Sequence, residues 1–236
     1  MASDGALGGG SGRPASVLPG LLTGAAMAVL LLGLGGPSLV GALVALPGVA
    51  AMSQVRAGDA LSPERYDQAA GALAESARFW PDGSLEADRG YLFLRRAEAM
   101  EPGETRDRAY RAAIDATQAG LASAPAQPSA WARLAYLELR QGNRPASLAA
   151  LRMSLITGSV VPELMTSRLE IGLRLAALFD AEMVGLMKRQ IRLIWILKPE
   201  YVTQLSADPS AADFVRAALA ELDEADMREF IRQNRR

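Results

Sequence analysis

The chain of 236 residues contains no cysteine and no histidine. Without cysteine it can form no disulfide, iron–sulfur cluster or thiolate zinc site, and it has no cysteine nucleophile. Without histidine it lacks the commonest general base and metal ligand. Lysine is nearly absent too, because Lys188 and Lys198 are the only two. The sequence also contains no P-loop, GxGxxG or HExxH motif.

These absences predict a protein that is not an enzyme and that has no cofactor and no metal site. A Ser–Lys dyad using Lys188 or Lys198 is the enzymatic alternative, but no flanking motif supports it. The acidic residues grouped near the end of the chain are better explained by helix capping than by cation binding; they are Glu221, Asp223, Glu224 and Asp226. The net charge of −1 provides no global field that attracts nucleic acid, so we expect protein partners and a lipid bilayer instead.

Charge is missing from one long stretch, residues 14–55, which lies between Arg13 and Arg56. Ionisable groups are expensive inside a bilayer, and a spanning helix needs about 20 apolar residues. The stretch therefore predicts a membrane anchor over residues 17–55. One straight helix of this length would measure about 63 Å, roughly twice the hydrocarbon thickness, so we expect it to be interrupted.

Proline and glycine mark the expected interruptions, at Pro19, Gly35-Gly36-Pro37 and Pro47-Gly48. The favoured interpretation is one kinked or tilted span over about 19–34, extending to about 46 if Pro37 only kinks the helix. The alternatives are a re-entrant hairpin that turns at Gly35-Gly36-Pro37 and a signal peptide cleaved near Val49-Ala50-Ala51.

The basic residues that flank the anchor nearly balance, with Arg13 before it and Arg56 and Arg65 after it. We expect a single-pass protein of a bacterial cytoplasmic (inner) membrane, with its amino end inside and its soluble part in the periplasm. Residues 1–16 are rich in glycine and serine and are predicted to be a disordered tail. The anchor also carries a ridge of small residues that would let two such helices pack closely; it consists of Gly20, Gly24 and Ala28.

Residues 57–236 are predicted to form one all-α domain, because apolar residues recur at helical spacing and glycine or proline separates the segments. The expected helices are 62–78, 85–100, 104–122, 128–142, 145–157, 162–178, 181–198, 208–222 and a last one from 223. Helix pairs joined by short turns must stack to bury their apolar faces. The predicted fold is thus a transmembrane helix followed by stacked helical hairpins.

Residues 128–158 carry the most specific pattern. Trp131, Leu134 and Ala135 follow a W-x₂-L-[G/A] spacing, and Gly142 closes this first helix. The second helix then presents small, large and small residues, at Ser147, Leu151 and Ser154. The segment resembles a tetratricopeptide repeat, in which small residues allow close helix crossing and large ones fill the seam.

The helix at 104–122 resembles the second helix of a preceding, degenerate repeat, although Pro102-Gly103 interrupts the expected first helix, which must lie earlier. An anchor followed by such repeats resembles small membrane-anchored proteins associated with bacterial exopolysaccharide export and O-antigen assembly. The resemblance implies a non-enzymatic scaffold or adaptor, in which the concave groove of the repeat binds a partner protein. The alternative is a small structural subunit of a larger membrane complex, held mainly by its transmembrane helix.

The residues expected to face the groove are Ser129, Ala132, Arg133, Tyr136, Leu139, Arg140 and Asn143. Tyrosine and arginine are good anchors for a partner segment. The competing interpretation is that Tyr136 and Leu139 are ordinary packing residues and that Arg140 is a solvated helix end.

Two further sets of residues could have a function beyond packing. Trp131 and Trp195 are expected in the core, with a glycan or cofactor platform as the alternative. Arg168 lies on a mostly apolar helix and is expected to extend its head to the surface. Its alternative is a buried arginine that holds Glu163, Glu170 or an anionic ligand.

Overall fold

A computed structural model of the chain describes residues 17–209, 211–220 and 222, with side chains described from 23 onward except at 34. Every element in these ranges is a helix and none is a strand, which confirms the all-α prediction. The predicted tail at 1–16 and the predicted last helix from 223 lie outside the described residues.

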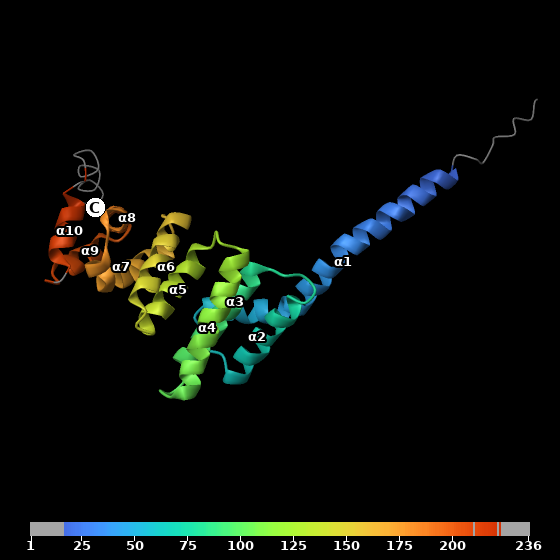
Figure 1. The fold of residues 1–236 in the computed structure, drawn as a ribbon, viewed down its shortest axis with the longest axis horizontal. Helices are drawn as coiled ribbons and strands as arrows, with labels where there is room; N and C mark the ends of the chain where they lie inside the picture. Colours follow the sequence, from blue (N-terminus) through green and yellow to red (C-terminus); the bar gives the residue numbers. More distant parts are fainter. Residues whose placement is uncertain (1–16, 210, 221, 223–236) are drawn as a thin grey trace, which may run out of the picture.

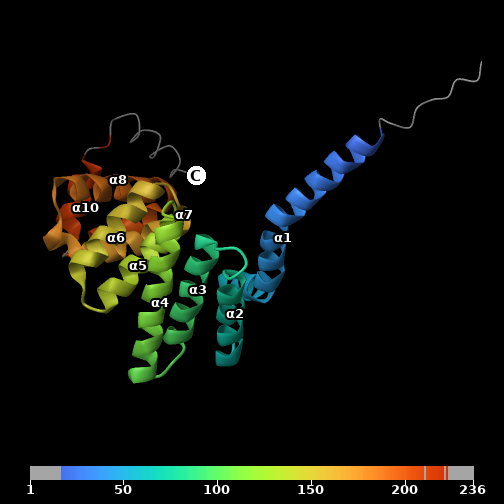
Figure 2. The same cartoon turned by 45° about the vertical axis from the view of Figure 1, so that its right-hand side comes forward.

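The N-terminal element α1 (Val17–Arg56) is one continuous helix of 40 residues, with Pro37 and Pro47 inside it. This agrees with the favoured kinked helix at Pro37, whereas the breaks expected at Pro19 and Pro47-Gly48 are wrong, and so is the hairpin that would turn at Gly35-Gly36-Pro37. An internal proline removes one backbone hydrogen bond and bends a helix, but the neighbouring turns can continue. Figure 2 shows α1 changing direction between its free part and the part beside α2.

The two halves of α1 have different surroundings. Over residues 23–40, Leu34 aside, most side chains are exposed, with Leu31 and Leu32 at 63% and 73%, and Figure 1 shows this part of α1 extending away from the other helices. From Gly41 onward one face is buried against α2 (Pro63–Ser76), including Ala45 and Met52. The residues that a cleaved signal peptide would remove thus include part of a packed core.

The remaining helices lie close to their predicted positions. They are α3 (Gly83–Glu98), α4 (Glu104–Ser123), α5 (Pro128–Arg140), α6 (Arg144–Thr157), α7 (Pro162–Leu175), the 3₁₀ turn η2 (Ala176–Leu178), α8 (Ala181–Leu197), α9 (Pro199–Ser206) and α10 (Ala212–Leu219). The main difference is α9, since the sequence predicted no helix between 198 and 208. Pro199 occupies the first position of α9, where its missing N–H costs nothing.

Local capping explains where several helices begin. The Asp82 carboxylate accepts a 2.7 Å hydrogen bond from the Ser84 amide at the start of α3. The Asp180 carboxylate accepts one of 2.8 Å from the Met183 amide at the start of α8. These bonds satisfy backbone N–H groups that have no partner within the helix.

Consecutive helices pair in antiparallel fashion and the pairs stack side by side, as Figures 1 and 2 show for α1 through α6. The α3–α4 pair is especially close, because a Cβ on Gly83 would lie 2.7 Å from the Gly120 carbonyl oxygen. The turns before α3, α5 and α7 consequently lie along one edge of the stack, and those before α2, α4 and α6 along the other.

Candidate partner-binding groove

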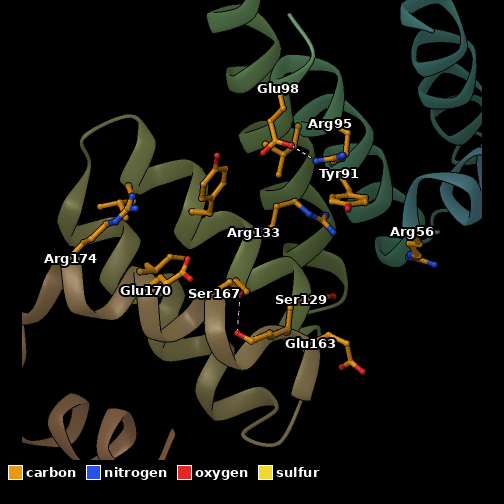
Figure 3. Close-up of a pocket in the computed structure, with 16 residues that line it drawn as sticks. Arg56, Tyr91, Arg95, Glu98, Ser129, Arg133, Glu163, Ser167, Glu170 and Arg174 are labelled. Atoms are coloured by element: carbon orange, nitrogen blue, oxygen red, sulfur yellow. Dashed lines mark hydrogen bonds and ion pairs between the residues drawn. The ribbon is translucent and has the colours of Figure 1, made fainter. Parts of the chain in front are cut away.

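A cavity of about 660 Å³ lies on the face of the stack formed by α3, α5 and α7, the first helices of successive pairs (Figure 3). Its lining combines apolar side chains with arginines and glutamates. The lining residues are Arg56, Tyr91, Leu94, Arg95, Glu98, Ser129, Ala132, Arg133, Tyr136, Leu139, Glu163, Leu164, Ser167, Glu170, Ile171 and Arg174.

The structure brings most of the predicted groove residues together on this lining. Ser129, Ala132, Arg133, Tyr136 and Leu139 of α5 all face the cavity. Ser129 is followed after three and four residues by Ala132 and Arg133, and Tyr136 and Leu139 continue the helical spacing, which places all five along one side of the helix. Whether they bind a partner stays a prediction.

Two predicted groove residues lie elsewhere. The Arg140 guanidinium stacks 4.4 Å from the ring centroid of Tyr110 on α4, and Arg140 does not line the cavity. Asn143 caps α6, accepting from the Ala146 amide at 3.4 Å and donating to Glu138 at 2.9 Å. Arg140 is therefore held against α4, and Asn143 belongs to the start of α6.

Arg133 is the most constrained charge on the lining. Its guanidinium lies 4.9 Å from the ring centroid of Tyr91 and donates a hydrogen bond to the Ala87 carbonyl. Burial lowers the pKa of Arg133 to about 10, although the nearby Asp88 carboxylate acts in the opposite direction. The side chain therefore joins α5 to α3 while its cationic head lines the cavity.

A second polar group borders the same cavity at Glu98. The Arg95 guanidinium donates to the Glu98 carboxylate at 2.6 Å. Burial, together with the negative charge of Glu98, raises the pKa of the Tyr136 phenol. Tyr136 therefore remains a neutral hydrogen-bonding group at physiological pH.

The end of α1 closes one side of the groove. The Arg56 guanidinium contacts both carboxylate oxygens of Asp88 on α3, at 2.8 and 3.0 Å. Burial raises the pKa of Asp88, and the charges of Arg56 and Arg133 partly oppose this effect. The end of α1 is thus tied directly to α3, one of the helices that form the groove.

The opposite side of the groove is formed by α7, which the sequence analysis did not assign to it. Leu164, Ser167 and Glu170 line the cavity, and the Tyr201 hydroxyl of α9 donates to Glu170 at 3.1 Å. Burial and the Glu170 charge raise the pKa of Tyr201 to about 12. No repeat consensus covers α7, so only the stacking of the helix pairs reveals its contribution.

The expectation for Arg168 is wrong, because its side chain is fully buried. Its guanidinium donates to the Ser154 hydroxyl at 2.9 Å and to the Ser154 and Gly158 carbonyls at 2.8 Å each. It therefore binds the carboxyl end of α6, where the helix dipole favours a cation. Burial lowers the pKa of Arg168 to about 10.

Trp131 and Trp195 are both half-buried and pack against the larger core. The Trp131 indole N–H donates to the Pro125 carbonyl at 2.7 Å. Among the described residues, no group of three or more Asp or Glu side chains is arranged to hold a metal ion. Glu221 and the acidic residues from 223 onward lie outside that part of the chain.

The predicted small-residue ridge lies on the free half of α1, where Gly24 and Ala28 are exposed and a Cβ on Gly24 would contact nothing within 4 Å. The surroundings of Gly20 lie outside the described residues. A second face of small residues, which was not predicted from the sequence, lies in the half of α1 that packs against α2. It consists of Gly41, Ala45 and Gly48. A Cβ on Gly48 would lie 2.6 Å from the Leu73 side chain, so this is the face that α2 occupies.

No protein-family profile matches the chain, and no curated protein sequence matches it either. Throughout the described part of the chain the regular structure is helical, and the N-terminal helix is long and apolar enough to cross a membrane.

Proposed function

We propose that the protein is a membrane-anchored adaptor that holds a segment of a partner protein in the groove between α3, α5 and α7. The observation that carries this proposal is the cavity of about 660 Å³ and its mixed lining. Apolar side chains such as Leu139 and Leu164 offer anchoring contacts, while arginines and glutamates beside them can pair with charges of either sign.

In this proposal the helix pairs form a tetratricopeptide-like solenoid. Ala113, Thr117 and Gly120 of α4 lie 34 residues before Ser147, Leu151 and Ser154 of α6, and all six are buried. That interval is the length of a tetratricopeptide repeat. The Ser147 hydroxyl donates to the Ala135 carbonyl at 2.7 Å, which supports a close crossing of α5 and α6 at the positions where such repeats carry small residues.

The free half of α1 is the proposed membrane span. Residues 17–40 would form a helix about 36 Å long, enough to cross a hydrocarbon core of about 30 Å with some tilt. The cytoplasmic membrane of a bacterium is the proposed location, with the helix stack on its periplasmic side. A role in exopolysaccharide or O-antigen assembly is a further part of the proposal and rests only on the pattern of an anchor followed by repeats.

Site-specific crosslinking in cells tests the groove. A photoreactive amino acid at Ser129 or Ser167, both exposed on the lining, is expected to capture the same partner protein. The matched control at Ala149, an exposed position on α6 outside the lining, is expected not to capture it.

The groove residues themselves supply the second arm of this experiment. The double variant Tyr136→Ala/Leu164→Ala should abolish the crosslink, because it removes two lining side chains, whereas Arg140→Ala should leave it intact. An unchanged crosslink in the double variant would overturn the groove proposal. If the partner is retained by the anchor alone, the alternative role as a structural membrane subunit is supported instead.

A further inference from the structure

The edge of the helix stack that carries the α2–α3, α4–α5 and α6–α7 turns has an unusual charge distribution. No charged residue occurs from 116 to 132, which includes the α4–α5 turn, or from 153 to 162, which includes the α6–α7 turn. The α2–α3 turn carries Arg78 and Asp82 but also two neighbouring aromatic residues. We call these three turns the apolar edge.

The opposite edge is rich in charge of both signs. Its α1–α2 turn carries Arg56 and Asp59, and its α3–α4 turn carries Glu101 and Glu104. Its α5–α6 turn lies between Arg140 and Arg144. This edge has the composition of an ordinary solvated surface, whereas the apolar edge does not.

Large apolar side chains are exposed on the apolar edge. Phe79 and Trp80 in the α2–α3 turn are 42% and 52% exposed. Ile156 and Val160, at the α6–α7 turn, are 54% and 61% exposed. Removing such apolar surface from water is favourable, so a covered state of this edge is favoured.

The free half of α1 leaves the stack at this same edge, as Figures 1 and 2 show. A Cβ on Gly41, where α1 first meets α2, would lie 3.2 Å from the Cβ of Trp80 and 3.3 Å from the Ser76 carbonyl oxygen. The aromatic pair of the α2–α3 turn therefore lies beside the proposed exit point of the membrane span.

We propose that the apolar edge rests on the bilayer from which α1 emerges, with Phe79 and Trp80 inserted among the lipid headgroups. The inference rests on the proposed role of α1 as a membrane span. Tryptophan is enriched at the membrane–water interface because its ring is apolar and its N–H is polar. Arg78, at the same turn, has a side chain that is 74% exposed and pairs with Glu75 at 3.0 Å; long arginine side chains of this kind can extend to an interface.

This arrangement sets the orientation of the groove. With three turns on the bilayer, the long axes of α3, α5 and α7 point away from the membrane surface. The groove between them then opens along the membrane plane, and the charged edge faces the aqueous phase. A partner segment would therefore enter from beside the protein.

Depth measurements on the full chain reconstituted in phosphatidylcholine vesicles test the inference. Because the chain has no cysteine, a single fluorophore can be attached at Ala126→Cys or Ser159→Cys on the apolar edge. Glu101→Cys and Gln141→Cys on the charged edge are the matched controls. Lipids that carry a nitroxide near the headgroup should quench the first two positions strongly and the controls weakly.

A label at Leu31→Cys, in the free half of α1, separates failure of this inference from failure of the membrane span. Quenching at Leu31 by nitroxide deep in the acyl chains, with no difference between the two edges, would overturn the apolar-edge proposal and leave the anchor standing. No quenching at Leu31 would overturn the anchor itself. The full-length variant Phe79→Ser/Trp80→Ser should lose quenching at Ala126 and Ser159 but keep it at Leu31.

Discussion

Arg168 connects two helices through a single buried side chain, and it does so without any carboxylate partner in the described part of the chain. Its neighbour Ser154 also donates to the Pro128 carbonyl at 2.6 Å, so the hydrogen bonds extend from α7 through α6 to the start of α5. The charged head thus satisfies backbone oxygens at the end of α6 that no helical amide can reach.

Replacing Arg168 should therefore be costly. Arg168→Ala leaves the Ser154 and Gly158 carbonyls without this donor at about 1–3 kcal/mol each, so we expect a loss of about 2–6 kcal/mol in the free energy of unfolding. Arg168→Lys, which keeps the charge but has fewer donors, should lose less. Urea unfolding measures both, with the exposed Arg189→Ala as control. Equal stability of Arg168→Ala and Arg189→Ala would contradict this account.

Gln190 on α8 is also a buried polar residue, but unlike Arg168 its side chain is not satisfied by hydrogen bonds from the described residues. It is 1% exposed, and within the described ranges neither its amide nitrogen nor its amide oxygen has a hydrogen-bond partner. Gln190→Met keeps a similar shape and removes both unsatisfied atoms, so it should raise the free energy of unfolding by about 1–2 kcal/mol. Thermal and urea unfolding against Gln204→Met, an exposed control on α9, would reveal the gain. A loss of stability would mean that the amide has a role.

The burial of Arg168 and Gln190 could not be predicted from the sequence. Arginine on an apolar helix is usually partly exposed, and only the fit of α7 against the end of α6 buries Arg168. By contrast, the side of α5 that faces the groove follows from helical periodicity alone, since Ser129, Ala132 and Tyr136 share one side of the helix.

At the scale of elements, helix starts were predictable where capping or proline marks them, as at Ser62-Pro63 and Asp180. A kink at Pro37 was predicted, but the continuation of α1 through Pro47 to Arg56 was not, because proline is a strong helix breaker in water and is accommodated here by a bend within a long helix. Glycine and alanine are so frequent in α1 that composition could not reveal which small face packs on α2. That face is defined by Leu73 and Ala69 of the neighbouring helix.

The α1–α2 seam gives a prediction at this scale. A Cβ on Gly48 would lie 2.6 Å from Leu73 and 2.9 Å from the Ala69 carbonyl oxygen, so the backbones must separate in Gly48→Val. We expect overpacking to destabilise the seam by about 1–3 kcal/mol and to increase proteolysis of the 57–62 connection. Gly33→Val, at a position with nothing within 4 Å, should leave proteolysis unchanged. Equal cleavage of the two variants would show that the seam tolerates the added volume.

For the whole molecule, the helix stack forms a groove from helices that are remote in sequence. Arg56, Tyr91 and Glu163 line one cavity although they come from α1, α3 and α7. The contribution of α5 could be predicted from the sequence because one repeat-like segment contains it. The contributions of α3 and α7 could not, because their positions depend on how each helix pair packs on the next.

We predict that the groove lies on the periplasmic side of the membrane. Because the chain has no cysteine, a single introduced cysteine can report on which side a position lies. Under the proposed topology, Ala149→Cys on the exposed face of α6 lies in the periplasm and Ser3→Cys in the cytoplasm. A membrane-impermeant maleimide added to spheroplasts should label Ala149→Cys at once and Ser3→Cys only after lysis. The reverse pattern would place the groove in the cytoplasm and would exclude periplasmic proteins as its partners. Labelling of both positions in intact spheroplasts would show that α1 does not cross the bilayer, because only a spanning helix separates the two sites.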